Sequence, residues 1–88
     1  MIEQTFLIAA FASSHQAIKA ETLAVRQGIP ARLVPLQPEI SAGCGLALRT
    51  SLDQHGALQA LFAEAGLQAD FYRYQRTGTQ RTAEKLED

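Results

Sequence analysis

The 88-residue sequence predicts a single α+β domain with a ferredoxin-like arrangement of strands and helices. Short apolar runs rich in β-branched and aromatic residues alternate with two segments of helical periodicity. Their order along the chain is strand, helix, strand, strand, helix, strand. That order is typical of the βαββαβ sandwich, in which a four-stranded antiparallel sheet carries both helices on one face. We therefore expect this domain over residues 1–76 and a polar, mobile tail over residues 77–88.

The first two elements have the clearest signals. Residues 5–11 form a continuous apolar run, which predicts a central strand buried on both faces. Ser13 followed by Gln16 is a capping-box pattern that marks the start of a helix. This helix is expected to run to about Gln27, because Gly28 suits a left-handed C-terminal cap.

The later elements follow from proline, glycine and alternating apolar residues. They are a strand at 29–34, an irregular loop at 35–43, a strand at 46–49, a helix that starts at Ser51 or Asp53 and ends at Gly66, and a strand at 70–74.

Composition and charge exclude several classes of function. The chain is 47% hydrophobic with a formal net charge of −1, as expected of a soluble globular domain. Its positive and negative residues cancel along the predicted fold without a basic stripe, which argues against nucleic-acid binding as a primary role. The apolar run at 6–12 is too short to span a bilayer and has no basic residue before it, so no membrane span or signal peptide is expected. A single cysteine excludes an internal disulfide and any CxxC motif, and suggests the reducing cytoplasm.

That cysteine, Cys44, lies between Gly43 and Gly45, where no neighbouring side chains bury the thiol and the backbone can approach a ligand closely. In the predicted topology it lies at the start of the third strand. It should therefore share one end of the molecule with the start of the first helix, formed by Ser13, Ser14 and His15.

This placement would activate the thiol. A helix N-terminus carries unpaired N–H groups and partial positive charge, which stabilise a thiolate and lower its pKa. His15 could relay a proton or, when charged, add a second cation. The alternative is that Cys44 is an inert small residue and His15 an exposed residue of the first turn.

Three further charged residues have two interpretations each. Glu21 projects among the apolar residues of the first helix, where it could orient a catalytic group; the favoured alternative is a rim position beside Lys19 or Arg26. Arg32 and Arg49 could hold an anion near Cys44, although a solvated position on the sheet is the simpler interpretation.

Two motifs resemble a known family. The Ser-x-His-x-Ala start of the first helix at 13–17 and the Ser-x-x-Cys-Gly segment at 41–45 are similar to those of the small bacterial Se/S carrier protein-like family, and the resemblance extends over about residues 5–74. It implies that Cys44 holds sulfur or selenium as a persulfide or perselenide. The chain lacks the Cys-Pro-x-Pro motif of the better-known sulfur carriers.

Two functions from different classes follow. In the first, a donor such as a cysteine desulfurase loads Cys44, and the loop presents the atom to an acceptor enzyme. This is a carrier rather than a true enzyme, and it needs no cofactor besides the covalently bound persulfide or perselenide. Ser13, Ser14, Gly43 and Gly45 would surround the carried atom. In the second, the domain is a regulatory or assembly module with a structural Cys44 and a partner surface on the last strand, and it could be a homodimer. A metal site is not expected, because one cysteine and distant histidines supply too few ligands.

Overall fold

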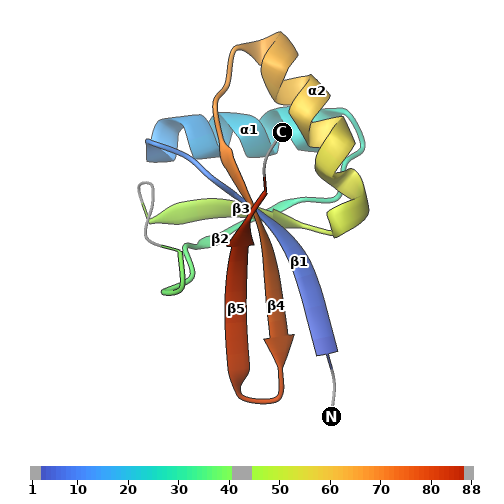
Figure 1. The fold of residues 1–88 in the computed structure, drawn as a ribbon. Coiled ribbons are helices and arrows are strands. Elements are labelled where there is room, and N and C mark those ends of the chain that lie inside the picture. Colours follow the sequence, from blue (N-terminus) through green and yellow to red (C-terminus); the bar gives the residue numbers. More distant parts are fainter. Residues whose placement is uncertain (1–2, 41–44, 87–88) are drawn as a thin grey trace.

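The computed structural model describes residues 3–40 and 45–86. The elements are β1 (Glu3–Ala10), α1 (Ser14–Arg26), β2 (Arg32–Pro35), β3 (Leu46–Thr50), a 3₁₀ turn η1 (Leu52–Gln54), α2 (His55–Ala65), β4 (Asp70–Thr77) and β5 (Gln80–Lys85). One sheet contains the strands in the order β2-β3-β1-β4-β5, and each neighbouring pair is antiparallel. The β4–β5 hairpin extends away from the two helices (Figure 1).

The prediction of a four-stranded ferredoxin-like sheet is wrong, although the α+β class holds. A fifth strand, β5, forms within the segment that was expected to be a polar tail. Gly78 has a φ of +59°, which suits the tight turn between β4 and β5, and each residue of β5 has a partner in β4. Backbone pairing with β4, rather than burial of side chains, holds this edge strand in place. The strand therefore needs no alternation of apolar residues, which is the signal by which a sequence predicts a strand.

The main core lies between the sheet and the helices. Leu7, Ala9 and Phe11 project from β1 and the residue that follows it, and they meet buried residues of both helices. The α1 side of this contact consists of Ala17, Ala20 and Ala24, all fully buried. Such small side chains let α1 approach the sheet closely.

A smaller cluster occupies the opposite face of the sheet, which we call the open face because neither helix covers it. Ile8, Ala47 and Tyr74 are buried there together with Ile40, which comes from the loop after β2. This loop, rather than a third layer of secondary structure, excludes water from the cluster. Both faces of β1 are therefore apolar, as the continuous run predicted.

The β2 edge of the sheet is closed by side chains. The Leu36 N–H donates to the Gly45 carbonyl at 2.9 Å and so points toward β3. Because successive N–H groups along a strand point in opposite directions, the Leu33 N–H points away from β3. The Leu33 N–H instead donates to Glu21 Oε2 at 2.9 Å. The other outward position is Pro35, which has no N–H. Glu21 thus ties α1 to β2, a contact that neither sequence-based interpretation included.

Candidate functional site

The start of β3 and the start of α1 lie at the same end of the molecule. Ala10, the last residue of β1, pairs with Ala47, the second residue of β3. Because α1 begins four residues after Ala10, its first turn lies at the same end of the sheet as Leu46, the first residue of β3. Figure 1 shows both starts on the left of the view. The starts of α1 and β3 therefore lie at one end of the molecule, as the predicted topology required.

The first turn of α1 has the predicted cap. Ser13 is extended, and its hydroxyl accepts a hydrogen bond from the Gln16 N–H at 3.2 Å. Ser14 and His15 are exposed, and no acidic residue occupies the first turn. The positive end of the helix is thus not neutralised by its own side chains and can interact with an anion.

Cys44 and Gly43 lie outside the described residues, so the predicted contact between the thiol and His15 stays a prediction. Gly45, which follows Cys44, is exposed and has a φ of +93°. A Cβ added at Gly45 would meet no atom of the described residues within 4 Å apart from its chain neighbours, so backbone conformation rather than crowding favours glycine at this position.

The chain is anchored on both sides of residues 41–44. On one side, the side chain of Ile40 is 4% exposed, and its N–H donates to the Gln37 carbonyl at 2.9 Å. On the other, the Gly45 carbonyl accepts from the Leu36 N–H. The hydrogen bonds and the buried side chain therefore fix the positions at which the segment containing Cys44 starts and ends.

A tyrosine on the open face strengthens this anchor. The Tyr74 hydroxyl donates to Glu39 Oε1 at 2.9 Å, next to the buried Ile40. Burial raises the pKa of Tyr74, and the hydrogen bond to the Glu39 carboxylate raises it further. The neutral phenol, which is the form that can donate, is thereby favoured. This contact joins the loop before Cys44 to β4.

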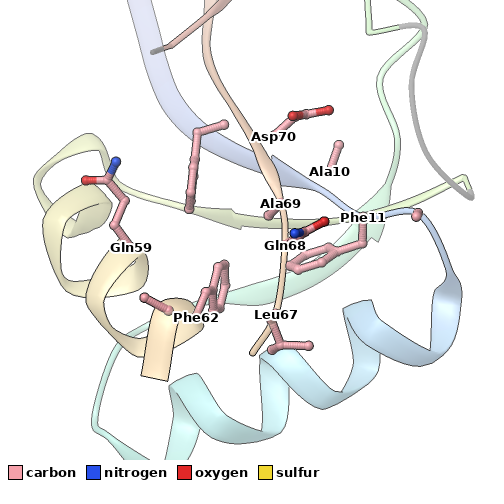
Figure 2. A pocket seen from close by; sticks show the side chains of 11 residues that line it. Ala10, Phe11, Gln59, Phe62, Leu67, Gln68, Ala69 and Asp70 are labelled. Carbon is pink, nitrogen blue, oxygen red and sulfur yellow. The ribbon is translucent and has the colours of Figure 1, made fainter. Parts of the chain in front are cut away.

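A cavity of about 560 Å³ opens near the same end of the sheet. Its apolar part is formed by side chains from β1, α2 and β4, and Figure 2 shows Phe11 and Phe62 near each other at this cavity. Their ring centroids are 5.5 Å apart in an edge-to-face arrangement. Asp70 lies at the rim and forms an ion pair with Lys85 at 3.6 Å. The cavity can accept a small apolar group.

Of the two arginine candidates, Arg32 has the predicted solvated position on the sheet, whereas Arg49 makes a contact that the sequence did not reveal. The guanidinium of Arg49 lies 4.9 Å from the centroid of the Phe6 ring, a cation–π contact on the open face. Arg32 pairs with Arg49 across β2 and β3 and is exposed. Among the described residues, no group of three or more His, Cys, Asp or Glu side chains could hold a metal ion. No helix in residues 3–40 and 45–86 has the length and apolar character needed to cross a membrane.

The fold and this loop define a small α+β domain with one anchored, glycine-flanked cysteine segment. Residues 6–73 match the family described as "Putative Se/S carrier protein-like", and the chain belongs to that family. This match confirms the family resemblance found in the motifs. No curated protein and no solved structure matches the chain.

Proposed function

We propose that the protein carries sulfur or selenium on Cys44, as a persulfide or perselenide, between a donor protein and an acceptor enzyme. The observation that carries this proposal is the family match over residues 6–73, whose description refers to an Se/S carrier. We place the carrier in the reducing cytoplasm, where a free thiol persists. The protein acts as a stoichiometric carrier and needs no bound cofactor.

The proposed transfer needs no external oxidant or reductant. The Cys44 thiolate attacks the outer sulfur of a persulfide on the donor, and a new S–S bond forms. The S–S bond of the donor breaks, and its thiolate leaves with the electron pair. A nucleophile of the acceptor then attacks the outer sulfur on Cys44 and releases the Cys44 thiolate. Selenium follows the same two displacements.

The geometry around the segment supports a reactive thiol. The start of β3 lies at the same end of the sheet as the N-terminus of α1, whose partial positive charge lowers the pKa of a thiol placed near it. In this proposal His15 relays the proton that the thiol loses. Ser13 retains an O–H that can donate, because its oxygen serves the cap only as an acceptor. Ser14 and the backbone of Gly43 and Gly45 complete the surroundings of the carried atom.

The decisive test is loading followed by intact mass measurement. Incubation with a cysteine desulfurase and cysteine should add one sulfur atom to the wild-type chain, and a reducing thiol should remove it. Cys44→Ser is the matched control and should remain unmodified. A wild-type chain that stays unmodified while an established carrier loads in parallel would contradict the proposal and favour the regulatory module with a structural Cys44.

The pH dependence of alkylation measures the activation directly. The rate of iodoacetamide reaction at Cys44 should reach half its maximum below the model thiol value of about 8.5. His15→Ala should move this midpoint upward if His15 contributes as a cation. A midpoint equal to that of a short peptide containing Cys44 would remove the electrostatic basis of the proposal.

A further inference from the structure

The open face of the sheet gathers most of the positive charge of the protein. Strand alternation and register place five of the eight Lys and Arg residues there: Arg32, Arg49, Arg76, Arg81 and Lys85. Of the acidic residues that the structure describes, two share the face, because Asp70 lies on β4 and Glu39 bonds to Tyr74. Five cations against these two carboxylates give the described part of the open face a net charge of +3, although the whole chain has a net charge of −1.

Four of these cations form two like-charged pairs. Arg32 lies directly opposite Arg49, and Arg76 lies directly opposite Arg81. Like charges at directly opposed positions destabilise a sheet. Within the described parts of the chain, the salt bridges are Arg73 with Glu84 and Lys85 with Asp70, so none of these four arginines has a carboxylate partner. An external anionic surface would relieve both repulsions.

The open face also bears the loop that leads to Cys44. Ile40 and Leu36 pack there against Ile8 and Tyr74, and Glu39 bonds to the Tyr74 hydroxyl. Arg81 lies close enough to Tyr74 to lower its pKa, in opposition to the effects of burial and Glu39. A molecule bound to the arginines of the open face would therefore lie next to the anchored end of the Cys44 segment.

We propose that the open face docks an acidic surface of the protein that donates sulfur or selenium to Cys44. This inference rests on the proposed carrier function and names the surface through which the carrier meets its donor. A protein fits better than a nucleic acid, because the three aromatic rings of this face are engaged with the sheet rather than free to stack on bases. Tyr74 is 2% exposed, Phe6 lies beneath the guanidinium of Arg49, and Tyr72 is partly buried against the open-face cluster.

The test compares charge reversals on opposite sides of the molecule. R76E/R81E reverses one pair on the open face, whereas K19E/R26E reverses two exposed cations of α1 and changes the net charge equally. The donor is the cysteine desulfurase of the same organism, supplied with cysteine, and the rate of sulfur addition to Cys44 is followed by intact mass. R76E/R81E should load about tenfold more slowly, whereas K19E/R26E should load like the wild type. Added salt should slow the wild type in the same way.

Two further measurements separate docking from folding and from chemistry. R76E alone places a carboxylate opposite Arg81, which favours the sheet, and should still slow loading. Cysteine persulfide, a small donor, should load the wild type and R76E/R81E equally, because it needs no docking surface. If neither donor loads the wild type, the carrier function itself fails.

The docking inference is overturned by any of three results. R76E/R81E could load from the desulfurase as fast as K19E/R26E. The wild type could load no faster from the desulfurase than from cysteine persulfide. Finally, a fluorescent single-stranded RNA could bind the wild type and lose binding in R76E/R81E while sulfur loading is unchanged, which would assign the open face to nucleic acid.

Discussion

Removal of the Glu21 carboxylate tests how α1 is attached to the edge of the sheet. Glu21 Oε2 accepts the Leu33 N–H at 2.9 Å, and this amide points away from β3. A hydrogen bond to a charged group contributes about 1.5–3 kcal/mol, and partial exposure of Glu21 reduces the expected loss in Glu21→Ala to about 1–2 kcal/mol. Helix propensity does not obscure the result, because alanine and glutamate both favour helices.

Urea unfolding measures this loss as a lower midpoint at unchanged slope. Glu21→Gln should lose less stability, since its side-chain oxygen can still accept the bond. Glu64→Ala, at an exposed position of α2, is the matched control and should resemble the wild type.

Amide hydrogen exchange resolves the contact residue by residue. In Glu21→Ala the Leu33 amide should exchange faster, whereas the Val34 amide, directed toward Ala47 of β3, should stay protected. An unchanged Leu33 exchange rate, or a Glu21→Ala stability equal to that of Glu64→Ala, would refute the assignment of Glu21 as the tie between α1 and β2.

Three further changes have defined outcomes. Because the pKa of Tyr74 is raised in the folded protein, its neutral form stabilises the fold below about pH 10, and this contribution is lost as pH rises further. The urea midpoint should therefore fall less between pH 8 and 11 in Tyr74→Phe than in the wild type. An equal fall of the midpoint in both proteins would contradict this. Gly45→Ala should cost about 1–2 kcal/mol in urea unfolding through its φ of +93°, without a steric clash, and a cost near zero would contradict the strained backbone. Among residues 3–40 and 45–86, His55 Nε2 is buried without a hydrogen-bond partner, and its ring centroid lies 4.7 Å from that of Phe71. His55→Phe should therefore leave the melting temperature equal or higher, and a clear decrease would reveal a missing partner.

Local signals predicted the helices and most strands of the fold. These signals act within a few residues, so they can be recognised in the sequence: the Ser13 cap, the left-handed Gly28 and Gly66, and the apolar run of β1. The fifth strand could not be recognised, because an edge strand needs little burial and Ala83 is the single apolar residue of Gln80–Lys85.

The topology around the candidate site was predictable in part, whereas the position of Cys44 stays a prediction. The sequence placed the start of the third strand and the start of the first helix at one end of the molecule, and the pairing of Ala10 with Ala47 puts the start of β3 beside the end of β1 there. The charge of the open face was missed because its cations are spread from Arg32 to Lys85 and meet only through strand register. The order of charges along the chain contains no basic stripe, because only the folded sheet brings these cations onto one face.

The closed β2 edge sets a limit on self-assembly. Glu21 occupies the outward N–H of Leu33, and Pro35 offers none, so another strand finds no donor along Arg32–Pro35. The opposite edge, β5, remains the one available for pairing within the described sheet. Copies that join edge to edge through β5 would thus leave two β2 edges that offer an added strand no backbone donor, which disfavours growth beyond a pair. The carboxylate that holds α1 against β2 therefore also disfavours strand addition at this edge.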